Sequence, residues 1–429
     1  IDGDAMKAAA YTLGCKVNQY DTQAMLELLQ QAGYEIVPFG QKADVYIINS
    51  CTVTNMADRK SRQMIGRAVQ LNEDAVVVVA GCLTQRSGEE ILAMPGVRAV
   101  LGTGDRGKIA SIVQKARQEK VNAVATDKPD FENLSVHSGG NMTRGYIKIQ
   151  EGCNQYCSYC IIPYVRGRAR SRPLAGILEE ARSLTGSRVR EVVLTGINIS
   201  SYRDGDFKLA DVLEGLDRID GLDRIRLGSL EPGLLTPAFI AGIARINKLC
   251  PHFHVSLQSG SDSVLARMNR TYTTEAYAAV IQNLRQAFDN PAITTDVITG
   301  FPGESDAEFR ETQDFIGRIG FSRLHVFPYS QRTGTKATQL PGAVPVELRK
   351  SRASELIAIG RGQEYAYSSG FVGRAEEVLF EHSLGGGWAE GHTTRYVKVH
   401  AKAEPYDLKL ILMTTLKNDI LTGESDYGG

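Results

Sequence analysis

The sequence has no excess of charge of one sign, no long apolar run and no signal-peptide pattern. Its 429 residues include 49 Lys and Arg against 49 Asp and Glu, which excludes a strongly basic nucleic-acid coat but leaves local basic patches open. The longest apolar run, Ala75 to Leu83, is far shorter than the roughly 20 residues of a membrane helix. The first residues lack the basic and then apolar order of a signal peptide. We therefore expect no membrane partner.

Seven cysteines are too few and too scattered for a disulfide framework, and their number is odd. We therefore expect a cytoplasmic protein, because thiols stay reduced there, and the cysteines need another role. Hydrophobic residues make up 42% of the chain and charged residues 23%, as in ordinary globular proteins. The length suggests about three domains.

Three regions differ in their patterns. Apolar runs alternate with helical stretches over residues 6–125, which predicts a parallel α/β domain. A polar linker is expected over 126–141. Six strand–helix units follow over 142–365, too few for a closed eight-fold barrel, so an open partial barrel is expected. Residues 366–429 are rich in β-forming stretches and predict a small antiparallel barrel. The predicted fold class is α/β with a C-terminal β-barrel.

Cys153, Cys157 and Cys160 form a C-x3-C-x2-C motif directly after the first expected strand of the second region. A structural zinc site needs a fourth ligand nearby, but the next cysteine is Cys250 and no His lies between Cys160 and His252. The spacing also differs from that of ferredoxins. A [4Fe–4S] cluster with three protein ligands fits, and its fourth iron would stay open to a small molecule.

This motif resembles the signature of radical S-adenosylmethionine (SAM) enzymes, C-x3-C-x-aromatic-C. Barrel active sites lie at the C-terminal ends of strands, and several expected strands here end in polar and Gly-rich residues. The competing interpretation, three structural cysteines in a loop, does not explain the aromatic residue between the last two cysteines. The residues expected to contact SAM are Tyr159, Thr195, Gly196, Ser256, Gln258 and Asp296.

Cys15, Cys51 and Cys82 are far apart in sequence, but each follows an expected parallel strand. Ligands of open α/β sheets bind beyond the carboxyl ends of the strands, so three sulfur atoms are expected at one crevice. The alternative is that each is a small buried apolar residue. That alternative would scatter the cysteines among strand interiors and helices.

With both trios, the chain after residue 6 resembles the methylthiotransferases, a radical SAM family whose C-terminal TRAM domain is a small RNA-binding barrel. The resemblance implies two [4Fe–4S] clusters and SAM as cofactors. The trio at 153–160 would hold the catalytic cluster that cleaves SAM. The trio of Cys15, Cys51 and Cys82 would hold an auxiliary cluster that carries the sulfur or methylthio group. Cys250 matches neither trio and is expected to be a structural thiol.

Within this family, the phrases at 12–19 and 152–164 resemble the branch that acts on threonylcarbamoyladenosine next to the anticodon of tRNA. The resemblance implies transfer of a methylthio group to C2 of that base. It also implies two partners, a tRNA anticodon stem-loop and an electron donor such as flavodoxin or ferredoxin. A pocket for the threonylcarbamoyl carboxylate should contain an Arg, and Arg203, Arg270 and Arg332 are considered for that role.

Three alternatives stay open. The family also contains enzymes for isopentenyladenosine in tRNA and for an aspartate of a ribosomal protein. A protein of another class, a non-catalytic iron–sulfur protein that binds RNA or carries electrons, would have the same cysteines. Cleavage of SAM separates the enzyme from the carrier.

RNA contacts are expected in two places. Alternate arginines in the run RGRARSR can line one face of an extended segment and meet phosphates, although a solvated basic loop has the same pattern. The region from Ala366 contains six Lys and Arg against nine Asp and Glu, so RNA contact there would need a local patch. The expected RNA-binding residues are Arg166, Arg168, Arg170 and Arg172, and Arg395, Tyr396 and Lys398 on one expected strand.

Overall fold

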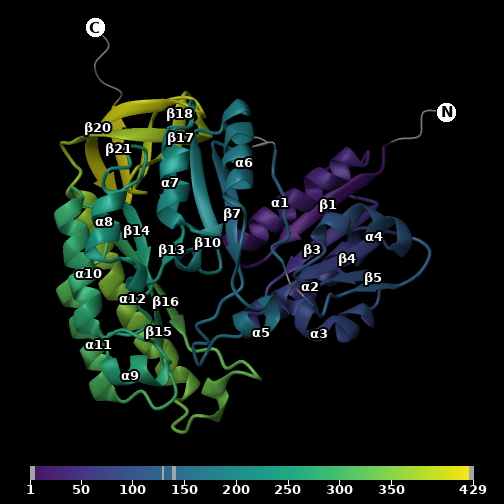
Figure 1. Ribbon diagram of the computed structural model, residues 1–429, viewed down its shortest axis with the longest axis horizontal. Coiled ribbons are helices and arrows are strands. Elements are labelled where there is room, and N and C mark those ends of the chain that lie inside the picture. Colours follow the sequence, from purple (N-terminus) through teal and green to yellow (C-terminus); the bar gives the residue numbers. More distant parts are fainter. Residues whose placement is uncertain (1–4, 128–129, 138–141, 425–429) are drawn as a thin grey trace.

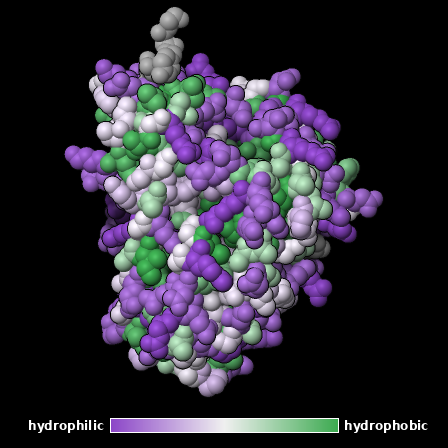
Figure 2. Space-filling view, turned by 90° about the vertical axis from the view of Figure 1, so that its left-hand side faces the viewer, coloured by the Kyte–Doolittle hydropathy of each residue, from purple (hydrophilic) through white to green (hydrophobic). Residues whose placement is uncertain are grey.

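The structure is a computed structural model that describes residues 5–127, 130–137 and 142–424 (Figure 1). It contains an N-terminal parallel α/β domain, a central open barrel and a C-terminal β-barrel, which confirms the predicted fold class. Among the described residues, no helix is long and apolar enough to cross a membrane. The face seen in Figure 2 is mostly hydrophilic, with apolar residues in small separate groups.

The N-terminal domain is a six-stranded sheet with the order β2-β1-β3-β4-β5-β6, and all of its pairs are parallel. The central strands are continuous apolar runs because helices cover both faces, and two separate buried clusters lie on the two sides. The elements are β1 (Lys7–Thr12), α1 (Lys16–Gln31), β2 (Glu35–Ile36), β3 (Val45–Ser50), α2 (Asn55–Leu71), β4 (Val76–Gly81), α3 (Cys82–Leu92), β5 (Val97–Leu101), α4 (Ile109–Ala116) and β6 (Val121–Ala123).

The central domain is an open arc of six principal parallel strands, one for each of the six expected strand–helix units. Two four-stranded sheets, β12-β9-β7-β8 and β13-β14-β15-β16, meet at a bridge between Ile225 and Leu249. The six strands are β7 (Arg144–Glu151), β9 (Glu191–Gly196), β12 (Arg224–Leu227), β14 (His252–Val255), β15 (Ala292–Thr299) and β16 (Arg323–Pro328). Short β8 (Arg170–Ser171) pairs antiparallel at the edge, and β13 (Ser229–Leu230) starts the second sheet.

Helices cover the outer face of this arc (Figure 1) and bury a single large apolar cluster against it. The short hairpin β10 (Arg203–Asp204) and β11 (Phe207–Lys208) lies between two of the units. The helices are α5 (Ile162–Arg166), α6 (Leu174–Gly186), α7 (Leu209–Asp217), α8 (Pro237–Ile243), α9 (Asp262–Arg267), α10 (Thr274–Ala287), α11 (Asp306–Ile319) and α12 (Val346–Ser369).

The segment 130–137 of the expected linker packs into the central domain. Leu134 and Val136 are buried in its core. The Tyr20 hydroxyl of α1 donates to the Leu134 carbonyl at 2.6 Å, and the Val136 amide donates to Glu180 on α6 at 2.9 Å. These contacts fix the N-terminal domain against the edge of the central arc.

The C-terminal domain is a closed five-stranded barrel with the order β17-β18-β19-β21-β20. Its pairs are antiparallel except β19 with β21, which is parallel, so the expectation of an antiparallel barrel needs this one correction. The strands are β17 (Ala375–Gly385), β18 (Trp388–Thr393), β19 (Lys398–Lys402), β20 (Leu408–Lys417) and β21 (Ile420–Glu424).

The barrel packs against the N-terminal ends of the central strands, at the opposite end from the cysteine loop. Arg224, at the start of β12, donates to the Glu377 carbonyl at 2.8 Å and to its carboxylate at 3.0 Å. Arg226 pairs with Glu191 at 2.6 Å and also donates to the Thr394 carbonyl at 2.9 Å. Two buried arginines of the central domain therefore dock the barrel through hydrogen bonds to its backbone carbonyls.

Candidate active site

The loop 152–167 after β7 carries the first cysteine trio. The Cys153 amide donates to the Gly167 carbonyl at 3.1 Å, which closes the loop at its base. Gly152 has φ +74°, and a Cβ there would lie 1.9 Å from the Arg168 carbonyl oxygen. Only glycine fits this position, because any side chain would push the loop ends apart. The loop is thus shaped to present Cys153, Cys157 and Cys160 together.

Polar groups of the central domain point at two of these sulfur atoms. The Gln155 amide lies 3.5 Å from the Cys153 sulfur. Arg270 donates from Nη1 to the Cys157 sulfur at 3.2 Å, and Glu231 holds the same guanidinium. Burial raises the pKa of the Cys160 thiol to about 12. A bound cation is therefore needed to keep that sulfur as the thiolate, the form that binds metals.

The second trio comes together at the carboxyl edge of the N-terminal sheet. Cys15 lies between β1 and α1, Cys51 follows β3, and Cys82 begins α3 directly after β4. A Cβ on Gly14 would lie 2.9 Å from the Cys51 sulfur, so the loops of Cys15 and Cys51 touch. Burial and then the nearby Cys82 raise the pKa of Cys51 to about 12. The fold thus gathers three residues that are far apart in sequence, from Cys15 to Cys82.

A guanidinium group from the central domain reaches the third sulfur of this trio. Arg166, the last residue of α5, donates from Nε to the Cys82 sulfur at 3.3 Å. Burial raises the pKa of Cys82, and the positive charge of Arg166 opposes that rise. Sequence reasoning missed both this contact and that of Arg270 with Cys157.

One cavity of about 540 Å³ joins the two trios. Cys15 and Cys51 line it on one side and Cys160 on the other, and its walls are mainly apolar. Three of the residues expected to contact SAM also line it. The lining is Gly14, Cys15, Cys51, Val53, Thr54, Ala57, Tyr159, Cys160, Ile161, Ile162, Gln258, Asp296, Ile298, Phe327, Pro328, Tyr329 and Ser330.

The other three residues expected to contact SAM do not line this cavity. Thr195 and Gly196 end β9, where a Cβ on Gly196 would lie 2.9 Å from the Gln150 carbonyl oxygen. The Ser256 amide donates to the Leu230 carbonyl at 2.9 Å. A second hollow of about 410 Å³ beside Gln155 and Asn198 lies past the end of β9. Thr195, Gly196 and Ser256 do not line that hollow either, so their expected contact with SAM stays a prediction.

The expected row of phosphate-binding arginines is wrong for two of its members. Arg166 and Arg172 are fully buried, because each finds a buried carboxylate, Glu151 at 2.6 Å from Arg166 and Glu180 beside Arg172. Arg170 turns inward and donates to the Arg166 and Arg168 carbonyls. Arg168 is the exposed member of the four.

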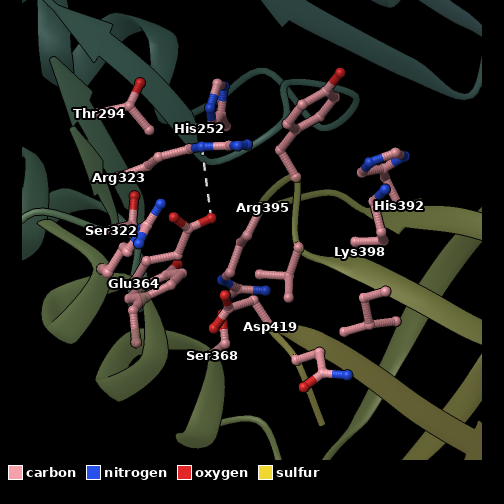
Figure 3. A pocket seen from close by; sticks show the side chains of 16 residues that line it. His252, Thr294, Ser322, Arg323, Glu364, Ser368, His392, Arg395, Lys398 and Asp419 are labelled. Atoms are coloured by element: carbon pink, nitrogen blue, oxygen red, sulfur yellow. Dashed lines mark ion pairs between the residues drawn. The ribbon is translucent and has the colours of Figure 1, made fainter. Parts of the chain in front are cut away.

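The C-terminal patch also differs from expectation. Arg395 and Tyr396 lie in the turn before β19, with Tyr396 at φ +63°, and not on one strand with Lys398. Arg395 is held by Glu376 at 3.0 Å and by the Asn290 carbonyl, so it docks the barrel. These residues line a cavity of about 380 Å³ between the two domains, beside the pair of Arg323 and Glu364 (Figure 3). Tyr396 stacks on His392.

The donor set of each trio fits an iron–sulfur cluster. All six thiols are free, and within the described ranges no three His, Cys, Asp or Glu side chains are arranged to hold a single metal ion. The cysteines of a [4Fe–4S] cluster each bind a different iron, so they need not meet at one point. With three cysteine ligands, each cluster would keep one iron open to a small molecule.

Comparison with known proteins agrees with this geometry. Residues 7–102 match the family described as "Uncharacterized protein family UPF0004", and residues 147–316 match the Radical SAM superfamily. The chain is 42% identical to threonylcarbamoyladenosine tRNA methylthiotransferase MtaB of Bacillus subtilis, over 91% of this chain and 89% of that protein. This chain belongs to the radical SAM methylthiotransferases. The predicted family and its enzyme class are therefore confirmed.

Other members and a more distant structure place the chain further. It is 36% identical to tRNA-2-methylthio-N(6)-dimethylallyladenosine synthase of Moorella thermoacetica, over 86% of each chain. The radical SAM methyltransferase TsrM of Kitasatospora setae, solved with tryptophan and a SAM analogue, has a TM-score of 0.57 at 16% identity. That alignment covers 75% of this chain and 72% of TsrM, and it shows that the fold is shared.

Proposed function

We propose that this methylthiotransferase adds a methylthio group to C2 of N6-threonylcarbamoyladenosine next to the anticodon of tRNA, with two [4Fe–4S] clusters and SAM. The observation that carries the proposal is the single cavity lined by cysteines of both trios. The C2–H bond of adenine offers no acidic proton, so its replacement needs a radical and a sulfur donor in one space. The name of the Bacillus subtilis relative supports the choice of substrate.

The protein residues would hold and shield these groups. Cys153, Cys157 and Cys160 would bind the cluster that, with SAM, supplies a carbon radical, and the second trio would bind the cluster that supplies sulfur. Tyr159, Gln258 and Asp296 extend into the shared cavity and would orient SAM. Buried wall residues such as Ile161 and Tyr329 would shield a reactive intermediate from water and so from side reactions.

The three arginines considered for the threonylcarbamoyl carboxylate are poorly placed for it. Arg332 is buried and donates to the Val53 carbonyl and to Asn55 and Asp58, so it clamps the loop after Cys51. Arg270 is held by Glu231 and Cys157. Arg203 is exposed on the β10–β11 hairpin, and β10 does not contribute to the cavity between the trios.

Lys16 does not line the cavity between the trios, but it lies directly beside Cys15, which does. It follows Cys15 directly and is exposed, and within the described residues no ion pair or hydrogen bond engages its ammonium group. Desolvation, and then the positive charges of Arg226 and Arg144, lower the pKa of Lys16 against the opposing charge of Glu191. A bound carboxylate would favour the charged form of this lysine. We assign Lys16 to the threonylcarbamoyl carboxylate. An isopentenyl group would leave this cation without a partner.

RNA contact is assigned to the exposed side of the first cysteine loop. Arg168 is exposed there, and Tyr164 and Tyr156 expose 53% and 39% of their surfaces, with ring centroids 6.0 Å apart. Exposed aromatic rings can stack on unpaired bases of an anticodon loop. Lys398 is a second, more distant contact. The reductant would be a flavodoxin or ferredoxin of the cytoplasm.

Nucleoside mass spectrometry of tRNA tests the proposal. A strain that lacks the gene should accumulate threonylcarbamoyladenosine without the methylthio group, and the wild-type gene should restore the product. The gene with Cys15→Ala should not restore it, whereas Cys250→Ala, in a buried thiol outside both trios, should. Loss of a methylthio group from isopentenyladenosine instead would move the enzyme to that branch. Unchanged tRNA would contradict a tRNA substrate.

A further inference from the structure

Arg166 connects the loop of the first trio with the three loops of the second trio, and it does so through three separate donor atoms. Its Nε donates to the Cys82 sulfur at 3.3 Å, its Nη1 to Glu151 at 2.6 Å and its Nη2 to the Asn18 side chain. Asn18 in turn donates to the Leu13 carbonyl at 2.6 Å and the Ser50 carbonyl at 3.0 Å. Leu13 and Ser50 precede Cys15 and Cys51, so one guanidinium braces all three loops of the auxiliary trio.

The same side chain is anchored in the loop of the first trio. Glu151 ends β7 two residues before Cys153, and Arg166 lies six residues after Cys160. The ion pair of Arg166 with Glu151 therefore joins the two ends of this loop. Because both side chains are fully buried, the separation of the two trios is fixed by this contact rather than by surface loops.

The charge of Arg166 is not cancelled at the sulfur. Its carboxylate partners, Glu151 and the more distant Asp21 at 3.7 Å, approach Nη1, whereas Nε faces Cys82. Arg106 and Lys148 share the same two carboxylates. A hydrogen bond from a cation to a cluster thiolate favours the more negative, reduced state, and hydrogen bonds to sulfur are a known lever on cluster potential.

We propose that Arg166 is a positioning residue of the auxiliary cluster, which raises the reduction potential of that cluster through its hydrogen bond to Cys82 and holds it at a fixed distance from the SAM cluster. This inference rests on the proposed function, because it assumes a cluster on the second trio. Among the described contacts, Cys15 and Cys51 receive no hydrogen bond from a cation, so Cys82 is the sulfur through which this hydrogen bond acts on the cluster.

The test is a potentiometric titration, followed by electron paramagnetic resonance, of full-length protein with Cys153, Cys157 and Cys160 all replaced by Ala. Only the auxiliary cluster then remains. Adding Arg166→Gln should shift the ratio of oxidised to reduced cluster about tenfold toward the oxidised form at a fixed potential, or about 59 mV for one electron. Arg166→Lys keeps the positive charge but not the several donors of the guanidinium group. It should shift the ratio of oxidised to reduced cluster in the same direction, but by less.

Arg172→Gln is the matched control. Arg172 belongs to the same basic run, is equally buried and is paired with Glu180 and Ser135, but it does not touch a sulfur. It should lower stability without moving the potential. An unchanged potential in Arg166→Gln, or an equal shift in Arg172→Gln, would overturn the inference. If Arg166→Gln cannot hold the cluster, an unchanged potential in Arg166→Lys overturns it. Absence of iron from the starting triple variant would instead refute the second cluster itself.

Discussion

The two cysteine trios line one cavity but are placed there by different parts of the fold. Cys153, Cys157 and Cys160 lie on one short loop, and the donor to Cys157, Arg270, comes from the same domain. The second trio is spread over three strand ends, and the donor to Cys82 comes from the neighbouring domain. Each donor is held by a glutamate, Glu231 or Glu151. The first trio is therefore built by one loop and the second by the edge of one sheet, and only the cationic donor of the second depends on how two domains pack.

The largest expected effect comes from removing either trio. Reconstituted wild-type protein should contain about eight irons, four for each [4Fe–4S] cluster. Replacing Cys153, Cys157 and Cys160 with Ala should remove half of the iron and all SAM cleavage. Replacing Cys15, Cys51 and Cys82 should remove half of the iron but leave cleavage of SAM to 5′-deoxyadenosine. Iron analysis and product chromatography measure both.

The control for this comparison is Cys250→Ala, which should keep all the iron because Cys250 lies away from both trios, buried near Arg226. If the second triple variant kept eight irons, its cysteines would not be ligands. If it lost SAM cleavage together with its iron, the two sites would not be independent.

The buried ion pair of Glu191 with Arg226 lies away from both trios. Its removal should change the stability of the fold without changing the clusters. Burial alone would raise the pKa of Glu191, but the charges of Arg226, Arg144 and Arg224 hold it below its usual value. Glu191→Gln leaves Arg226 without its carboxylate and should cost about 3–5 kcal/mol of stability, measured by denaturant unfolding. Both iron clusters should still assemble at low temperature. Glu347→Gln, on an exposed pair with Lys350, should change stability by less than about 1 kcal/mol.

The same pair predicts a pH dependence. A carboxylate whose pKa is lowered by folding contributes stability above its unfolded pKa of about 4.3, and this contribution is lost as pH falls through the folded value. Acid unfolding of the wild type should therefore begin below about pH 4.3. In Glu191→Gln this component should be missing, so the drop in stability below pH 4.3 should be shallower. An identical acid profile in both proteins would contradict the assignment.

The sequence predicted the six central strands, the parallel N-terminal sheet and both trios, because each follows from local patterns that burial reinforces. It failed for the run RGRARSR. The alternation of arginines in this run cannot reveal that Arg166 and Arg172 form buried ion pairs with Glu151 and Glu180. One signal was present: Glu151 ends a strand whose last five residues are all buried, and a buried carboxylate requires a cationic partner. The turn at Tyr396 was also missed, because the sequence around it is typical of a single strand.

The next prediction concerns substrate choice beside the second trio, where Lys16 follows Cys15. Lys16→Met removes the charge but keeps the chain length. It should lower kcat/KM on a stem-loop with threonylcarbamoyladenosine roughly ten- to a hundredfold, the equivalent of about 1.5–3 kcal/mol for a hydrogen bond to a charged group. Iron content and SAM cleavage should stay as in the wild type. Equal loss on an isopentenyl stem-loop would show that Lys16 does not read the carboxylate.

The smallest expected effect concerns the outer side of the first cysteine loop, where Arg168 and Tyr164 are both exposed. A phosphate contact weakens with salt and is independent of sequence, so Arg168→Gln should reduce the slope of log K against log salt by about 1. Tyr164→Ala should instead weaken binding of the anticodon stem-loop by about 1–3 kcal/mol with the slope unchanged, because stacking carries no net charge. Filter binding at several salt concentrations measures both.

The buried Arg172 supplies the control for this experiment. Its replacement by Gln should leave the salt slope at the wild-type value in protein that remains folded. A slope that drops equally in Arg168→Gln and Arg172→Gln would mean that the loop changes shape rather than losing a phosphate contact. RNA would then have to approach the shared cavity from another side.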